Sequence, residues 1–104
     1  MEIEYHPIAA VKPYPDYPDI DDATISVVIW SIREIDFCNP ILVNERDEVI
    51  SGHVRLAAAQ RLGMTEVPVI VCDNMPPDQV HALRLIDYQD QIFSVLRVKQ
   101  HATA

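Results

Sequence analysis

The residues best equipped for chemistry lie in one short turn, Ser51-Gly52-His53-Val54-Arg55. An apolar run ends at this turn, and an alanine-rich helix is expected to begin within it. The first N–H groups of a helix lack internal partners, and the helix dipole adds partial positive charge there. Glycine lets an anion approach the backbone closely, and arginine can grip two of its oxygens. The turn therefore predicts a phosphate site made by Ser51, Gly52, His53 and Arg55.

The same turn also has a purely structural interpretation. In that interpretation Ser51 only caps the helix and Arg55 is a solvated surface residue. Many junctions between a strand, a glycine and a helix bind nothing, and Gly-His-x-Arg is far less specific than a Walker motif. Spacing alone leaves both interpretations open.

The rest of the chain predicts the elements that must hold this turn. A short strand is expected over 5–11, with Pro7 at a sheet edge, and a helix over 23–35, with Asp22 as its cap. The remaining expected elements are a hairpin with strands at 41–43 and 48–50, a helix over 53–62 ended by Gly63, a strand over 66–72 and a last helix from about Pro77. This order predicts an α+β fold, a small mixed sheet with flanking helices.

The length of 104 residues predicts a single domain spanning 1–104, with a core at about 5–89 and a C-terminal helix and tail over 90–104. The N-terminus lacks signal-peptide features and no apolar run is long enough to span a membrane, so we expect a cytoplasmic protein. Cys38 and Cys72 are interpreted as small buried hydrophobes. The four histidines show no ligand spacing, so we expect no metal site.

The net charge of −8 bears on the partners of the chain. Nucleic acid is held mainly by lysine and arginine, and only eight such residues are present. Direct DNA binding by this chain alone is therefore not expected. Short-range hydrogen bonds can still outweigh a screened distant field, so a site for one small anionic ligand remains compatible with the charge. The segment 12–22 is acidic and rich in proline, which predicts an extended loop.

An ordered series of motifs from about Tyr5 to Gln89 resembles the ParB/sulfiredoxin superfamily, and in particular its ParB-like N-terminal domain, also called the ParB-like nuclease domain. The matching features are a helix ending in Ser31-Ile32-Arg33-Glu34, then Asn39-Pro40-Ile41 entering a strand, the turn Gly52-His53-Val54-Arg55, a helix ending in Leu62-Gly63, and the strand Val67-Pro68-Val69-Ile70-Val71. The long ordered match is specific for the fold and much less specific for an activity.

The resemblance implies roles for individual residues of the turn. The family's partition proteins carry Gly-Glu-Arg-Arg here and bind and hydrolyse CTP, sulfiredoxins carry Gly-Cys-His-Arg and contact ATP phosphates, and a further branch carries Gly-His-x-Arg, as this chain does. Gly52 and Arg55 match the parts shared by all three and are implied to contact phosphate. Asn39 and Pro40 are implied to shape the wall of the site. A nucleoside triphosphate, CTP or ATP, with Mg²⁺ is the implied ligand.

Departures from the family narrow the function. His53 stands where sulfiredoxins have their reactive cysteine, so sulfiredoxin-type reduction is not expected. Asp36 stands where the family commonly has a glycine, and Asp87-Tyr88 where it often has Asp-Asn. The N-terminal loop is acidic where relatives often have a basic residue, which would weaken nucleotide binding.

Three functions remain open at this point. The first is a small nucleotide- or phosphate-binding regulatory module that works with a partner protein in a DNA-handling system, such as partition, methyltransferase or mobile-element systems. The second is a phosphotransferase or nuclease that uses the same turn. Its His53 would be a general base or a metal ligand, because imidazole titrates near neutral pH, and Glu34 or Asp36 would supply a carboxylate. The third is a degenerate, non-catalytic domain that binds only a protein.

Overall fold

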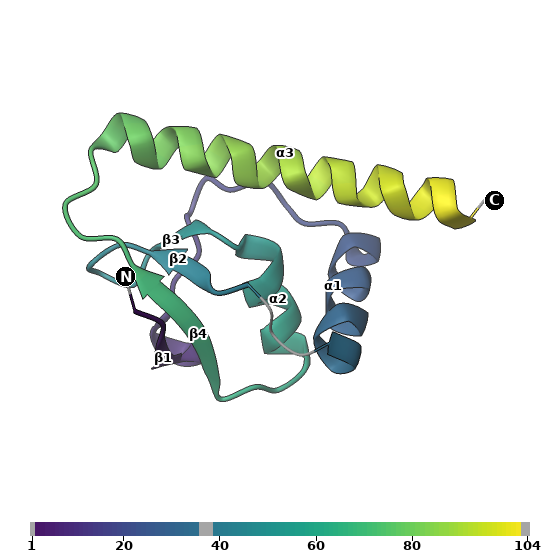
Figure 1. Ribbon diagram of the computed structural model, residues 1–104, viewed down its shortest axis with the longest axis horizontal. Coiled ribbons are helices and arrows are strands. Elements are labelled where there is room, and N and C mark those ends of the chain that lie inside the picture. The colour runs from purple at the N-terminus through teal and green to yellow at the C-terminus, as the bar shows by residue number, and fades with distance from the viewer. Residues whose placement is uncertain (1, 36–38, 103–104) are drawn as a thin grey trace.

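The structure is a computed structural model that describes residues 2–35 and 39–102, with side chains described as far as Gln89. The elements in chain order are β1 (Glu4–Pro7), the short 3-10 helix η1 (Ile8–Ala10), α1 (Asp22–Ile35), β2 (Ile41–Val43), β3 (Val49–Ser51), α2 (His53–Arg61), β4 (Glu66–Val71) and α3 (Pro77–Ala102). The sheet has the order β1-β4-β2-β3, in which β4 runs parallel to β2 and the other two pairings are antiparallel. This is the expected α+β fold, a small mixed sheet with flanking helices (Figure 1).

Helix α2 lies between the sheet and α1 and is buried on both sides. Leu56 and Ala59 pack into the apolar cluster of the sheet, whereas Val54 and Ala58 pack against Ile25 of α1. These positions recur at helical spacing, and small alanine side chains let the neighbouring elements approach closely. The packing therefore fixes the first turn of α2 firmly at the end of β3.

Helix α3 crosses one side of the domain and extends past α1 (Figure 1). Neither apolar cluster contains a described residue of α3, and its Leu85 and Ile86 are 49% and 52% exposed. Arg84 instead donates from Nε and Nη2 to the carbonyl oxygen of Val49, at 3.3 and 3.1 Å, and its guanidinium carbon lies 3.9 Å from the ring centroid of Tyr14. The described part of α3 is thus held mainly by polar contacts.

The predicted N-terminal strand is shorter than expected. Only Glu4–Pro7 is a strand, and Ile8–Ala10 form a 3-10 helix where the sequence suggested a strand over 5–11. Pro7 is the last residue of β1 because proline cannot donate to a continuing ladder. The strand does lie at a sheet edge, as predicted.

The predicted end of α2 is confirmed, whereas the predicted cap of α1 is wrong by one residue. Helix α2 ends at Arg61 with Leu62 as its C-cap, and Gly63 follows with a φ of +72°, as expected for a glycine after a helix C-cap. At the start of α1, the cap is Asp21, whose Oδ1 accepts a hydrogen bond from the backbone N–H of Ala23 at 2.8 Å, and Asp22 is already helical.

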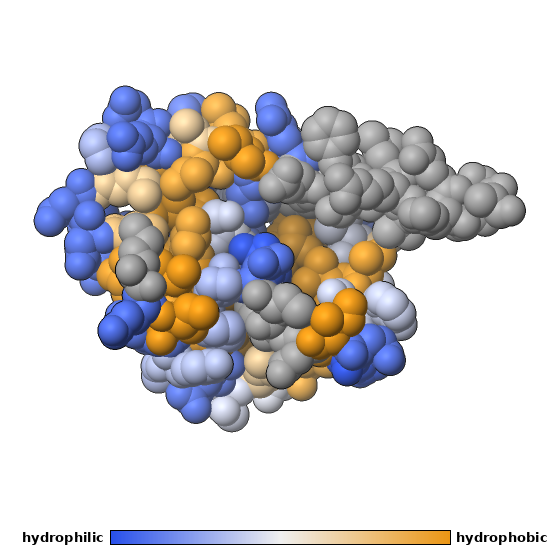
Figure 2. Space-filling model, viewed as in Figure 1, coloured by the Kyte–Doolittle hydropathy of each residue, from blue (hydrophilic) through white to orange (hydrophobic). Residues whose placement is uncertain are grey.

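Two residues noted in the sequence, Asp36 and Cys38, lie outside the described residues. Cys72 is a buried free thiol, in agreement with its interpretation as a small hydrophobe. Within the described ranges, no helix has the length and apolar character needed to cross a membrane. Hydrophobic surface gathers over β4 and over α3 some way past its start, whereas the upper left, where α3 begins, is largely hydrophilic (Figure 2).

Candidate functional site

The site begins at Gly52, which joins β3 directly to α2. Gly52 has a φ of +107°, and its carbonyl oxygen accepts the first helical hydrogen bond from Leu56 at 3.0 Å. A Cβ at this position would lie 2.9 Å from Nη2 of Arg55 and 3.2 Å from Cγ1 of Ile41. The backbone conformation therefore favours glycine here, and a Cβ would in addition force the Arg55 and Ile41 side chains to shift.

The N-terminus of α2 is capped by a carboxylate from a distant part of the chain. Asp87 of α3 accepts hydrogen bonds from the backbone N–H groups of Gly52 at 3.1 Å and His53 at 3.4 Å. It also accepts from Nδ1 of His53 at 2.9 Å and from the hydroxyl of Ser51 at 3.5 Å. The N-cap position of α2 is occupied by Gly52, which has no side chain to cap the helix. Ser51 lies one residue earlier and is therefore not the cap. Asp87 fills the position that the sequence predicts for an anion.

The electrostatics of this contact favour an ionised Asp87. Burial by itself would raise the pKa of the Asp87 carboxyl, but the hydrogen bonds from the His53 side chain and the Gly52 backbone outweigh it and hold the pKa below its ordinary value. Backbone N–H groups at a helix start stabilise negative charge in the same way. The turn therefore binds an anion in this structure, and that anion is the Asp87 carboxylate of the same chain.

Both ring nitrogens of His53 are engaged. Nε2 lies 3.1 Å from the backbone nitrogen of Tyr14, and because a backbone N–H can only donate, Nε2 is the acceptor and Nδ1 carries the hydrogen that is donated to Asp87. The His53 residue is only 3% exposed. In this arrangement the ring positions Asp87 and the N-terminal loop, and it has no lone pair left to accept a proton from a substrate.

The proline-rich loop covers the site with aromatic rings. The ring of Tyr17 stacks on that of His53, with centroids 3.8 Å apart and an interplanar angle of 9°, and it meets Tyr88 of α3 edge-on at 6.2 Å. Burial raises the pKa of Tyr17, and the nearby carboxylate of Asp87 raises it further. The loop and α3 thus close over the start of α2 together.

The predicted site residues separate into two groups. Arg55 donates from Nη2 to the carbonyl oxygen of Pro40 at 3.3 Å, which brings Arg55 and Pro40 together at the turn with Gly52. Asn39 is exposed, and Glu34 is exposed in the last turn of α1 with no hydrogen bond to His53. The structure therefore gathers Ser51, Gly52, His53, Arg55 and Pro40, and it adds Asp87, Tyr14 and Tyr17, which the sequence did not place in the site.

The hydrogen bonds of the turn converge on one carboxylate, that of Asp87. Among the side chains the structure describes, no group of three or more His, Cys, Asp and Glu residues is arranged to hold a metal ion. A Mg²⁺ ion can be held by one carboxylate together with substrate phosphates. At this turn both oxygens of Asp87 already accept hydrogen bonds from Ser51, Gly52 and His53, so the carboxylate is held by the turn and is not presented to a cation.

Comparison with known proteins agrees with this fold. The ParB N-terminal domain family matches residues 1–87. The ParB-like nuclease domain-containing protein YnaK of Escherichia coli is 32% identical over 80 residues, covering 76% of this chain and 92% of that protein. The chain therefore belongs to the ParB N-terminal domain family.

Solved structures give the same result. The chromosome-partitioning protein ParB of Caulobacter crescentus, complexed with CTP-gamma-S, superposes with a TM-score of 0.73 and 26% identity over 85% of this chain and 53% of that chain. Sulfiredoxin from Arabidopsis thaliana superposes with a TM-score of 0.66 and 26% identity over 81% of this chain and 99% of that chain.

Nucleoid occlusion proteins also match in sequence, for example that of Geobacillus thermodenitrificans at 32% identity, and this chain spans about a third of their length.

Proposed function

We propose that this domain binds the phosphates of a nucleoside triphosphate, CTP or ATP, at the N-terminus of α2, in competition with its own Asp87. The observation that carries the proposal is the set of hydrogen bonds from Ser51, Gly52 and His53 to the Asp87 carboxylate. These donors already select and hold an anion. A phosphate presents more acceptor oxygens than a carboxylate and a greater negative charge.

Displacement of Asp87 would release α3 from the rest of the domain. Asp87 and Arg84 lie on one side of α3 and supply its described polar contacts to β3 and to the turn. Since no described side chain of α3 belongs to the apolar clusters, little apolar contact opposes the movement. In the proposed function, nucleotide binding thus controls whether α3 is docked on the domain. A partner protein would recognise this change in the position of α3.

The relatives support a role beside DNA. A chromosome-partitioning protein and nucleoid occlusion proteins are among them. The net charge of −8 disfavours direct phosphate-backbone contacts by this chain, so the proposal includes a protein partner that carries the DNA-binding function. Fluorescence anisotropy with labelled duplex DNA is expected to show no binding by this chain alone at physiological salt.

A second candidate is a domain that binds only a protein. It is favoured by the closed site, in which Asp87, Tyr14 and Tyr17 use the groups that a ligand would need. An enzymatic role for His53 has less support, because both of its ring nitrogens are engaged and Glu34 lies apart from it.

The two candidates are separated by thermal unfolding in the presence of nucleotide. A ligand that binds only the folded state raises the unfolding midpoint. We expect CTP or ATP with Mg²⁺ to raise the midpoint of the wild-type chain, and Arg55→Ala to abolish the rise because its guanidinium lies at the turn.

Arg61→Ala is the matched control. Arg61 lies at the other end of the same helix and pairs with Asp22 at the surface, at 2.6 Å. This variant is expected to keep the nucleotide-induced rise. Absence of a rise with every nucleotide would favour the protein-binding candidate, and an equal rise in Arg55→Ala would place the nucleotide elsewhere.

A further inference from the structure

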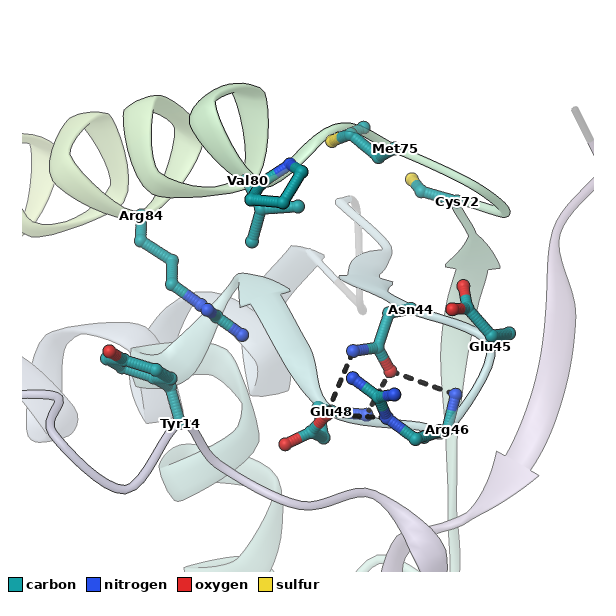
Figure 3. A pocket seen from close by; sticks show the side chains of 10 residues that line it. Tyr14, Asn44, Glu45, Arg46, Glu48, Cys72, Met75, Val80 and Arg84 are labelled. Carbon is teal, nitrogen blue, oxygen red and sulfur yellow. Dashed lines mark hydrogen bonds and ion pairs between the residues drawn. The ribbon is translucent and has the colours of Figure 1, made fainter.

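A second hollow lies beside Arg84, outside the α2 turn. It has a volume of about 360 Å³ and is walled by the N-terminal loop, the β2–β3 turn, the segment after β4 and the first turns of α3. Figure 3 shows Arg84 reaching into it from α3, with Tyr14 on one side and the polar side chains of the β2–β3 turn across from it. The volume lies within the range of small-molecule sites.

Arg84 presents an unused donor group to this cavity. Its Nε and Nη2 are bound to the carbonyl oxygen of Val49, which fixes the plane of the guanidinium. Nη1 makes no hydrogen bond within the described part of the chain, and Arg84 lines the cavity. A positioned guanidinium with free N–H groups is suited to a carboxylate.

Glu48 presents an unused acceptor on the opposite wall. Its Oε1 accepts from both Asn44 and Arg46, each at 3.0 Å, whereas Oε2 has no hydrogen bond among the described residues. The hydrogen bonds from Asn44 and then Arg46 lower the pKa of Glu48, so the carboxylate stays ionised. Glu48 and Arg84 do not form an ion pair with each other, and a gap remains between the two charges.

The charges of the wall are balanced. Arg46 and Arg84 contribute two positive charges, and Glu45 and Glu48 contribute two negative ones. This balance gives no net attraction to a phosphate or to a simple cation. Met75 and Val80 add an apolar wall, and methionine adapts readily to the shape of an aliphatic group.

We propose that this cavity binds a free aliphatic α-amino acid, with its carboxylate on Arg84, its ammonium group on Glu48 and its side chain against Met75 and Val80. The zwitterion places one charge opposite each unused group. The cavity lies outside the α2 turn, but it includes Val80 and Arg84 of α3, so the proposal applies to the nucleotide-free state in which α3 is docked.

The test is a titration followed by amide chemical shifts, with leucine, valine and methionine as probes. Leucine is compared with 4-methylpentanoate, which lacks the ammonium group, and with 3-methylbutylamine, which lacks the carboxylate. At least one amino acid is expected to cause saturable shifts at Glu48, Val80 and Arg84, and each single-charge analogue of leucine should bind at least about tenfold more weakly than leucine. No saturable shift with any of the three amino acids, or equal binding of leucine and its analogues, overturns the proposal.

Two variants test the location. Glu48→Gln keeps the hydrogen-bonding shape of the turn and should weaken binding about tenfold, and Val80→Phe should abolish binding by filling the cavity. Leu85→Phe, on the exposed side of the same helix, is the control and should bind as the wild type does. Wild-type affinity in a folded Val80→Phe chain, checked by its dispersed spectrum, also overturns the proposal.

Discussion

The carboxylate of Asp87 lies 2.9 Å from Nδ1 of His53 and 3.1 Å from the backbone nitrogen of Gly52. Through these contacts α3 supplies the cap for α2, from a position 35 residues away in the chain. The same contacts fill the start of α2 with a negative charge. The same Asp87 contacts therefore both fill the anion site and hold α3 against the domain.

The requirement for glycine at the turn leads to a prediction about stability. Gly52→Ala and Gly63→Ala both place a side chain at positive φ, which costs roughly 1–2 kcal/mol. Only at Gly52 would the new Cβ meet Arg55 and Ile41, whereas nothing lies within 4 Å at Gly63. Urea unfolding is expected to show a larger loss of stability for Gly52→Ala. Equal losses in the two variants would contradict the tight turn.

The polar attachment of α3 predicts local opening. Asp87→Asn and Arg84→Met each weaken contacts of α3 with the turn or β3. Hydrogen exchange at the amides of 80–88 should accelerate, by about 5- to 30-fold for a loss of 1–2 kcal/mol. The amides of Val67 and Val69 in β4 should not change, because they belong to the sheet cluster. Uniform acceleration of both regions would show that α3 does not open separately.

A histidine distant from the site predicts a pH effect. His6 contacts Glu4 at 3.0 Å and Asp47 at 2.8 Å. The hydrogen bond to Glu4 raises the pKa of His6 above its ordinary value of 6.5, and Asp47 raises it further, against the opposing effect of burial. The contribution of protonated His6 to the stability of the fold is complete below its ordinary pKa. It is lost as the pH rises through the raised pKa of His6 in the folded protein.

The measurement is the free energy of unfolding between pH 5 and 9, in wild type and in His6→Asn. The wild type should lose between about 0.2 and 1 kcal/mol more than the variant over this range, since the groups are partly exposed. His81→Asn, at an exposed position of α3, should retain the wild-type profile. If the pH dependence of the free energy of unfolding were the same in His6→Asn as in the wild type, His6 would not be the cause of the pH effect.

The sequence predicted the sheet, the three helices and the turn at Gly52 because each rests on local patterns. Apolar periodicity placed α1 and α2, and glycine marked both ends of α2. The partner of the turn was not predictable in this way. Asp87 is far along the chain; it matches the aspartate of the family's Asp-Asn pair, from which only Tyr88 departs, and the sequence assigns it no contact. The contacts of Tyr14 and Tyr17 with His53 were not predictable, because the composition of segment 12–22 predicts an extended loop and does not indicate what that loop packs against.

The expected enzyme residues show a similar limit. His53 lies in the turn, but the hydrogen-bonding state of its ring depends on two partners from other segments, Tyr14 and Asp87. Sequence spacing cannot show that both nitrogens are used. Asn39 and Glu34 remain predictions, since they are exposed and no described contact joins them to the ligand turn.

The central claim is that the start of α2 is an anion site occupied by Asp87. The most direct test is a titration of the wild type and of Asp87→Asn with inorganic triphosphate, without metal, followed at the amides of Gly52 and His53. We predict saturable shifts in the variant at concentrations at least about tenfold lower than in the wild type, because the competing charge has been removed. A response in the variant that is absent, or no stronger than in the wild type, would contradict the account.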